Sequence, residues 1–456
     1  MKGLKDILPP DGFSDAPETL VCYGFDASGT GSKPSAVVWP EGTDDVARIS
    51  KFASDNRIAI VPRGAGTGMT GGAVPLNGAI IISFERMNRI LEVDEKNLTA
   101  LVEPGVINGQ LQREIEPMGL FYPPDPASMH FCTIGGNVAE NAGGPRAVKY
   151  GVTRDYVLGI EAVLPDGRVI NTGVRTMKGV VGYDLTGLIV GSEGTLCTMT
   201  RIRLKLAPLP QAVTTILAVF DDLRKCGSAV SDITSSLIVP RVLELMDRET
   251  IKAVESYKPT GLPADAEALL LIELDGQERA IAEDAEKVSN LCKALGAAVN
   301  VAVSEEQRQR LWEARRSLSP ALFHISPGKV SEDIVVPRSR IPDLLVRLRS
   351  LSKKRGIDIV SFGHAGDGNI HVNIMADRND PDQKEIIKKV VKEVFEICLE
   401  MGGTISGEHG VGTTKAGHMG LEVKGPALDM MKGIKEVFDP MNIMNPGKIF
   451  VNRDRH

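Results

Sequence analysis

Glycine is concentrated in four short segments, and this limits the possible folds of the chain more than any other feature. Residues 62–72, 135–151, 363–368 and 402–412 contain 18 of the 47 glycines, whereas average usage of about 7% would place about 3 there. Glycine is favoured where the backbone takes a positive φ or approaches a ligand closely. Segments so far apart and so alike indicate that both halves of the chain contribute to one site.

The first glycine segment contains Gly66-x-Gly68-x-x-Gly71 directly after the apolar stretch 58–61, which predicts a strand. A Rossmann dinucleotide site has this spacing, but it also needs a helix at once, whose N-terminus meets the pyrophosphate. Here the loop leads through Pro75 into a second apolar run at 79–84, so the Rossmann interpretation is excluded. Unbonded N–H groups of such a loop can still bind a diphosphate, and the alternative is a purely structural turn.

The first 210 residues alternate short apolar runs with amphipathic stretches. Thr43 is expected to cap a helix that buries Val46, Ile49 and Ala53. Pro165-Asp166-Gly167 is typical of a hairpin turn. The pattern predicts strands at 36–39, 58–61, 79–84, 98–102, 157–164 and 168–171, and a helix in 105–119.

A second region begins after the rigid stretch Leu206-Ala-Pro-Leu-Pro210, where glycines become rarer and helices longer. Its first half resembles a ferredoxin-like layer, because strands and helices alternate as two βαβ-like units. Strands are predicted at 213–220, 239–246, 268–274, 298–303, 358–364 and 370–375. Helices are predicted at 222–236, 248–257, 278–295, 305–318, 340–354, 383–401 and 426–438.

Composition excludes several functional classes. The 53 basic and 59 acidic residues give a net charge of −6 without long blocks of one sign, which disfavours nucleic-acid binding. No stretch approaches the ~18 apolar residues of a membrane span, and the charged start lacks the apolar run of a signal peptide, so we expect a cytoplasmic protein. The six cysteines form no C-x-x-C pair, so neither a thiolate metal site nor an iron–sulfur cluster is expected.

Three of the seven histidines fall in two motifs. His364 and His371 flank a Gly-Asp-Gly turn, which predicts a tight hairpin with Asn373 on the same face as His371. Glu408 and His409 lie together between glycines. Two imidazoles and a carboxylate form a usual ligand set for a catalytic divalent ion, and zinc, manganese and iron all remain possible.

A second loop of small residues and amides is expected at 133–144. Together with this loop and the segments Lys149-Tyr-Gly151 and Gly191-Ser-Glu-Gly-Thr195, the motifs above resemble the vanillyl-alcohol-oxidase-type flavoproteins from about residue 36 to 450. Among them the chain is similar to the FAD-dependent D-2-hydroxy-acid dehydrogenases of glycolate oxidase D, D-lactate and D-2-hydroxyglutarate type. The resemblance implies an α+β fold with a two-part FAD-binding domain of PCMH type in 1–210. It further implies a ferredoxin-like cap domain with the metal site in 211–415, and a C-terminal helical segment, 416–456, that returns to the FAD domain.

The resemblance also implies which residues bind FAD. Because neither flavin loop contains a histidine, a non-covalent flavin is expected. Glu193 and Gly194 are assigned near the adenine, and Asn445 opens the closing motif Asn-Pro-Gly-Lys. The remaining implied FAD contacts are Pro62, Arg63, Gly64, Ala65, Gly66, Thr67, Gly68, Pro124, Asp125, Thr133, Gly136, Asn137, Asn141 and Gly143.

For the substrate side, the resemblance assigns His364, His371 and Glu408 as metal ligands and His409 as the base. Asn373 matches a substrate contact, and Arg315 matches the arginine that binds the substrate carboxylate. Ser319 stands where the hydroxyglutarate enzymes have threonine. Lys329 is a further substrate-binding candidate, although the spacing around it departs from that branch and disfavours a dicarboxylate.

The expected activity is FAD-dependent oxidation of a D-2-hydroxy acid, of glycolate or D-lactate type, to the 2-oxo acid. A divalent metal would assist proton abstraction, and hydride would pass to flavin N5. Electrons are expected to reach an iron–sulfur subunit, an electron-transfer flavoprotein or a quinone, in a homodimer or hetero-complex that contacts a membrane only through a partner. Two alternatives remain: a flavin-free metallohydrolase, and an electron-transfer flavin subunit of a larger complex.

Overall fold

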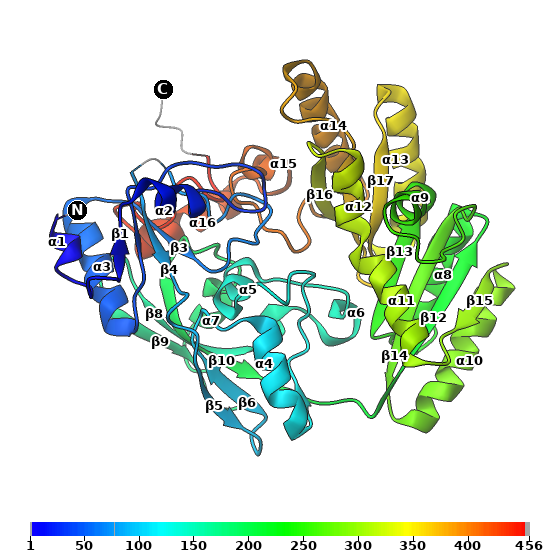
Figure 1. The fold of residues 1–456 in the computed structure, drawn as a ribbon, viewed down its shortest axis with the longest axis horizontal. Helices are drawn as coiled ribbons and strands as arrows, with labels where there is room; N and C mark the ends of the chain where they lie inside the picture. The colour runs from blue at the N-terminus through cyan, green and yellow to red at the C-terminus, as the bar shows by residue number, and fades with distance from the viewer. Residues whose placement is uncertain (1, 77, 452–456) are drawn as a thin grey trace. The chain divides into compact units, whose positions relative to one another are not determined.

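The computed structural model describes residues 2–76 and 78–451, which form two compact units (Figure 1). Unit 1 comprises Met1–Gly143, Val152–Leu209 and Glu408–His456, and unit 2 comprises Gly144–Gly151 and Pro210–Gly407. The chain leaves unit 1 at the predicted rigid stretch. The units differ from the predicted ranges in three places, because residues 144–151 and Pro210 belong to unit 2 and residues 408–415 belong to unit 1.

Unit 1 contains a four-stranded sheet in which β2 (Ala36–Val38), β4 (Ile80–Ser83) and β3 (Ile60–Arg63) run parallel. Helix α3 (Thr43–Asn56) buries Val46, Ile49 and Ala53 in one apolar cluster, which also contains Ile60 of β3 and Ile80 and Ile82 of β4. Thr43 does not cap this helix, which corrects the prediction. The cap position is Gly42, and the Thr43 hydroxyl instead donates to the Glu161 carboxylate at 2.7 Å.

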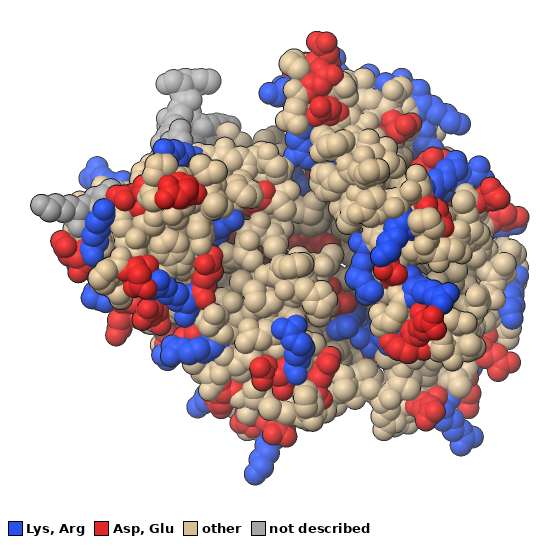
Figure 2. Space-filling model, viewed as in Figure 1, with Lys and Arg blue, Asp and Glu red and all other residues tan. Residues whose placement is uncertain are grey.

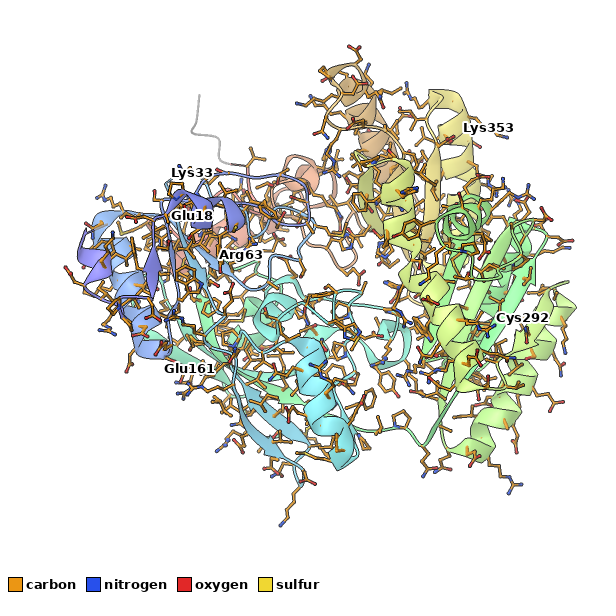
Figure 3. The ribbon with its side chains drawn as sticks, viewed as in Figure 1. Glu18, Lys33, Arg63, Glu161, Cys292 and Lys353 are labelled. Atoms are coloured by element: carbon orange, nitrogen blue, oxygen red, sulfur yellow. The ribbon has the colours of Figure 1, made fainter. Side chains whose placement is uncertain are left out.

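The second sheet of unit 1 is antiparallel, in the order β5-β6-β10-β8-β9. The predicted hairpin is confirmed as β8 (Val157–Val163) and β9 (Val169–Gly173). Glu161 on β8, labelled in Figure 3, also accepts a hydrogen bond from Thr200 of β10 at 3.0 Å. The other strands are β5 (Ile90–Asp94), β6 (Thr99–Val102) and β10 (Thr198–Lys205).

Residues 133–144, which the sequence suggests to be a loop, contain the short helix α5 (Ile134–Glu140). The Thr133 hydroxyl caps it by accepting from the Gly136 N–H at 3.2 Å. Two glycines in the first turn lower helix propensity, which explains why the sequence pattern concealed it. The other described elements of unit 1 are α1 (Lys2–Lys5), β1 (Phe13–Ser14), α2 (Pro17–Cys22), α4 (Asn108–Ile115), η1 (Glu116–Met118), β7 (Leu120–Phe121), η2 (Thr153–Tyr156), α7 (Leu185–Ile189), β11 (Ala207–Pro208), η4 (Ala416–His418), α15 (Met419–Glu422) and α16 (Pro426–Phe438).

The C-terminal segment completes unit 1 beside β3. The Ile60 N–H donates to the Ile443 carbonyl, the Asn445 N–H donates to the Ile60 carbonyl, both at 2.8 Å, and Ile60 forms a parallel bridge with Met444. Ile443 and Met444 are buried in the apolar cluster of β3, β4 and α3. This C-terminal segment is therefore part of the core that supports the first glycine loop.

Unit 2 is built on a seven-stranded antiparallel sheet in the order β15-β12-β14-β13-β17-β18-β16. Its first four strands follow the ferredoxin-like order, which confirms that prediction. The strands are β12 (Ala212–Phe220), β13 (Val242–Asp247), β14 (Ala268–Gly276), β15 (Ala298–Val301), β16 (Val330–Val335), β17 (Ile359–His364) and β18 (Asn369–Ile374).

Helices cover both faces of this sheet (Figure 1). Helices α9, α11 and α12 bury apolar side chains against Leu217, Met246, Leu271 and Phe362 on one face. The predicted helix 305–318 is divided at Ser317 into α11 and α12. The helices are α6 (Ala147–Tyr150), α8 (Leu223–Ser235), α9 (Arg248–Tyr257), α10 (Glu278–Ala294), α11 (Glu305–Arg316), α12 (Leu318–Ile325), η3 (Arg338–Arg340), α13 (Ile341–Arg355) and α14 (Pro381–Glu400).

The surface agrees with the balanced composition. On the face drawn in Figure 2, basic and acidic side chains are interspersed. Among the residues described, no helix is both long and apolar enough to cross a lipid bilayer. All six cysteines are free thiols, and all but Cys22 are buried.

Candidate active site

A cavity in unit 1 is lined by the glycine loop after β3, by α5 and by the start of the C-terminal segment. Parts of three of the four glycine-rich segments therefore meet in one unit, namely 62–72, 135–143 and 408–412, while the fourth segment, 363–368, belongs to unit 2. The predicted FAD contacts that line the cavity are Pro62, Arg63, Gly64, Ala65, Gly66, Thr67, Gly68, Thr133, Gly136, Asn137, Gly143, Glu193 and Gly194. Glu408 and His409 line it as well.

The loop 64–68 is suited to an anionic group. Within the described residues, none of its backbone N–H groups has a hydrogen-bond acceptor, so these donors remain for a ligand. Arg63 (Figure 3), at the end of β3, is buried beside the loop and donates from Nη1 to the Phe25 carbonyl at 2.8 Å. The cavity thus combines a guanidinium with a row of amide donors, which fits a diphosphate.

Four predicted FAD residues are not among the residues that line the cavity. The Asn445 side chain donates to the carbonyls of Gly72 and Glu193 at 2.9 and 2.7 Å, and so joins two of the loops. Asn141 ends α5 in the left-handed region with φ +54°, and its side chain accepts from the Arg154 N–H. The Pro124 carbonyl accepts from the Asn108 side chain, and Asp125 is buried.

Glu193 fixes the segment that carries Glu408 and His409. Its buried carboxylate accepts from the N–H groups of Val411 and Gly412 at 2.8 and 2.7 Å. Burial raises the pKa of Glu193, and these two hydrogen bonds oppose that rise. Thr70 also holds the segment, since its hydroxyl donates to the His409 carbonyl at 3.0 Å. Sequence reasoning missed this role of Thr70, because a threonine in a glycine loop carries no distinctive signal.

The predicted histidine hairpin is confirmed in unit 2. His364 ends β17 and His371 lies in β18, and their ring centroids are 5.1 Å apart. Both rings are buried, and His371 is opposite Phe362 on one side and Asp333 on the other. Asn373 lies on the same sheet face, two residues further along β18. Two imidazoles at this separation can bind one divalent cation.

Glu244 is a functional candidate that the sequence analysis did not identify. Its carboxylate accepts from His364 Nδ1 at 2.5 Å and from Arg315 Nε of α11. Burial tends to raise the pKa of Glu244, but Arg315 and His364 outweigh it and lower the pKa to about 2. One sequence signal could have identified Glu244, because a carboxylate in the middle of an otherwise apolar strand, Val242–Asp247, is unusual.

The other predicted substrate residues surround the hairpin within unit 2. The Arg315 guanidinium lies over the Phe362 ring, 5.2 Å from its centroid. Lys329 is buried, and its Nζ donates to Asn373 Oδ1 at 2.8 Å. Burial, assisted by the charge of Arg378, lowers the pKa of Lys329 to about 8. Ser319 is half-buried in the first turn of α12.

Glu408 follows directly on a backbone segment that is tied to the hairpin sheet. The Asp333 carboxylate accepts from the Gly407 N–H at 2.9 Å, and Asp333 is opposite His371 in the β16–β18 pairing. Glu408 is the next residue and the first of the C-terminal part of unit 1. Consecutive Cα atoms are ~3.8 Å apart, so the Glu408 Cα lies ~3.8 Å from that of Gly407, whose N–H is bonded to Asp333.

Comparison with known proteins gives consistent results. Residues 34–173 match the family model described as "FAD binding domain", and residues 209–449 match "FAD linked oxidases, C-terminal domain". The chain is 46% identical over 455 residues to the glycolate oxidase subunit GlcD of Bacillus subtilis (strain 168), covering 99% of this chain and 97% of that protein. It is 37% identical to the D-lactate dehydrogenase of Anaerostipes hadrus, covering 92% and 90% of the two chains.

Solved structures agree on the fold. The chain superimposes on p-cresol methylhydroxylase with bound substrate at a TM-score of 0.82, covering 100% of this chain and 97% of that one, at 19% sequence identity. This likeness confirms the PCMH-type α+β architecture that the sequence motifs imply.

Proposed function

The chain belongs to the FAD-linked oxidase family and is an FAD-dependent hydroxy-acid oxidoreductase, and from this premise we propose that its substrate is a D-2-hydroxy acid of glycolate or D-lactate type. One observation carries the proposal: the glycine-lined cavity of unit 1 also contains Glu408 and His409. A flavin pocket with a carboxylate and an imidazole in its wall is suited to removing the proton of a hydroxyl group on the carbon that is oxidised.

A divalent metal is the second part of the proposal, with His364, His371 and Glu408 as its ligands. The donor set fits, since it offers two nitrogen atoms and one carboxylate oxygen and leaves positions for a bidentate substrate. Zinc, manganese and iron all accept these ligands. When bound, FAD supplies the hydride acceptor and the metal lowers the pKa of the substrate hydroxyl.

The side chains divide the remaining tasks. Arg315 binds the substrate carboxylate, which a planar guanidinium can do through two parallel hydrogen bonds. His409 accepts the hydroxyl proton as the general base. Asn373 orients the substrate, and Lys329, which donates to Asn373, and Ser319 are further substrate contacts. Because these contacts hold the carboxylate and the hydroxyl group of the substrate in place, they reduce the entropic barrier to hydride transfer.

Electron transfer to a partner completes the proposal. The B. subtilis relative is named a subunit, which supports a hetero-complex, and a homodimer is the alternative assembly. The proposed electron acceptors are an iron–sulfur subunit, an electron-transfer flavoprotein or a quinone. A cytoplasmic location and a membrane contact through the partner alone are parts of the same proposal. The flavin-free hydrolase alternative is not supported, because residues 34–173 match an FAD-binding domain.

The proposal is tested by anaerobic mixing of the purified FAD-loaded protein with a panel of D- and L-2-hydroxy acids. Glycolate or D-lactate is expected to bleach the yellow flavin within seconds, whereas L-lactate leaves it oxidised. D-2-Hydroxyglutarate serves as the dicarboxylate comparison. Bleaching by L-acids alone, or by no 2-hydroxy acid in the panel, contradicts the proposed substrate class.

Lys329 makes the reaction sensitive to alkaline pH. Its pKa of about 8 means that the ammonium is charged below pH 8 and neutral above it, so substrate carboxylate binding weakens as the pH rises. We expect kcat/KM to fall about tenfold per pH unit above roughly pH 8. In Lys329→Arg the guanidinium stays charged, so this fall should disappear from a pH–rate profile. If kcat/KM of Lys329→Arg falls with rising pH as it does in the wild type, the fall belongs to another group.

A further inference from the structure

We propose that Glu244 is a positioning residue that orients both a metal-binding imidazole and the substrate-binding guanidinium. The inference rests on the proposed function, which assigns His364 to the metal and Arg315 to the substrate. Glu244 lies on β13, opposite His364 in the pairing with β17 and opposite Leu271 in the pairing with β14. Its side chain has no solvent exposure, so these partners replace water around the charge.

The contact to His364 selects one ring nitrogen for the metal. Nδ1 lies 2.5 Å from Glu244 Oε1, and a carboxylate acceptor holds the proton on that nitrogen. The lone pair is then on Nε2, which is the ring nitrogen that can coordinate a cation. Carboxylates in this outer position fix the tautomer and the orientation of a ligating histidine and increase its basicity.

The contact to Arg315 uses the other carboxylate oxygen and only Nε of the guanidinium. The two terminal nitrogens of Arg315 make no hydrogen bond to any of the described residues, so they can bind a second carboxylate, that of a substrate. Stacking on Phe362 fixes the plane of the guanidinium. Because one rigid carboxylate binds both groups, movement of Glu244 would displace the imidazole and the guanidinium together.

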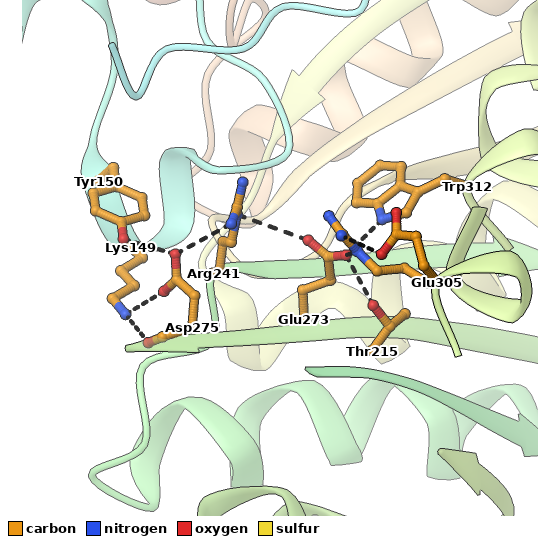
Figure 4. A network of polar contacts seen from close by, with 9 residues as sticks. Lys149, Tyr150, Thr215, Arg241, Glu273, Asp275, Glu305 and Trp312 are labelled. Carbon is orange, nitrogen blue, oxygen red and sulfur yellow. Dashed lines mark hydrogen bonds and ion pairs between the residues drawn. The ribbon is translucent and has the colours of Figure 1, made fainter. Parts of the chain in front are cut away.

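A second buried carboxylate on the same sheet face provides a matched control. Glu273 on β14 accepts from Arg308 Nε at 3.0 Å and from Trp312 Nε1 at 2.6 Å (Figure 4). Arg308, Trp312 and Arg315 recur along one face of α11, so Glu273 and Glu244 hold the same helix. Glu273 also accepts from Thr215 and contacts Arg241, which places its partners away from the histidine hairpin.

The test compares Glu244→Gln with Glu273→Gln in the full-length, FAD-loaded, metal-stripped protein. Mn²⁺ affinity is measured by electron paramagnetic resonance of free Mn²⁺, and FAD content by visible absorbance. We expect Glu244→Gln to weaken Mn²⁺ binding about 10- to 100-fold and to raise KM for the accepted hydroxy acid. Glu273→Gln should keep the wild-type Mn²⁺ affinity within about twofold, even if it changes KM through α11.

Each outcome supports or overturns the inference. Wild-type Mn²⁺ affinity in an FAD-containing Glu244→Gln protein overturns it, as does equal weakening in Glu273→Gln, which would reflect general loosening of α11. If Glu244→Gln does not fold, Glu244→Asp, which keeps the charge but is shorter by one methylene, is measured instead and should bind Mn²⁺ more weakly than wild type. Wild-type protein that bleaches with substrate but binds neither Mn²⁺ nor Zn²⁺ refutes the proposed metal site, and the role of Glu244 toward it, while the flavin chemistry stands.

Discussion

Replacing His371 by alanine is expected to abolish flavin reduction by substrate while FAD remains bound. Loss of a proposed metal ligand would remove charge stabilisation of several kcal/mol, so we expect the bleaching rate to fall by about 10³-fold or more. FAD is expected to stay because His371 belongs to unit 2, whereas the glycine-lined cavity is formed by unit 1. Stopped-flow absorbance measures the rate, and the visible spectrum before mixing measures the FAD content.

His324→Ala is the control for this experiment. His324 is exposed on α12 and packs on the Tyr257 ring, 5.5 Å between centroids, and no step of the proposed reaction uses it. Its bleaching rate should remain within about twofold of wild type. An undiminished rate in His371→Ala would show that the proposed metal site takes no part in flavin reduction by the substrate.

The second large effect is expected for Gly412→Ala. Gly412 has φ +53°, and a Cβ there would overlap the backbone carbonyl of Thr70. The left-handed conformation costs an alanine ~1–2 kcal/mol, and the overlap with a backbone atom cannot be relieved by a side-chain rotation. The segment that begins with Glu408 and His409 must therefore shift on the cavity wall. A misplacement of ~1 Å can cost about 10²-fold in rate, which is the loss expected in anaerobic bleaching.

Gly417→Ala tests whether this loss is specific. Gly417 lies in η4 of the same C-terminal segment, and a Cβ there would meet no heavy atom within 4 Å. Its rate of flavin reduction and its FAD content should match wild type. If Gly412→Ala reduces its flavin as fast as Gly417→Ala does, the position of the 408–412 segment does not limit the chemistry.

The sequence was sufficient to predict the elements that are determined by residues close to one another in the chain. The hairpin of His364 and His371 was predictable because the Gly-Asp-Gly turn and the two-residue period of strands place both rings. The ferredoxin-like layer was predictable from the alternation of apolar runs and amphipathic helices. By contrast, α5 was missed because its two glycines hide the cap that Thr133 provides.

Partners distant in sequence account for what could not be predicted. Glu244 is far from His364 and Arg315 along the chain, and only the antiparallel register of β13 and β17 brings it to the histidine. The carboxylate of Glu193 likewise accepts from the N–H groups of Val411 and Gly412, which lie 218 and 219 residues further along the chain. No single segment carries a pattern for such contacts.

The pairing of Ile60 with residues 443–445 has a consequence for how the protein is made. Translation proceeds from the N-terminus, and domains that are contiguous in sequence can fold as they leave the ribosome. Here the core that supports the first glycine loop is complete only once residues 443–445 have been synthesised. We therefore expect FAD to bind after these residues have left the ribosome, and a nascent chain that stalls before Asn445 to remain apo.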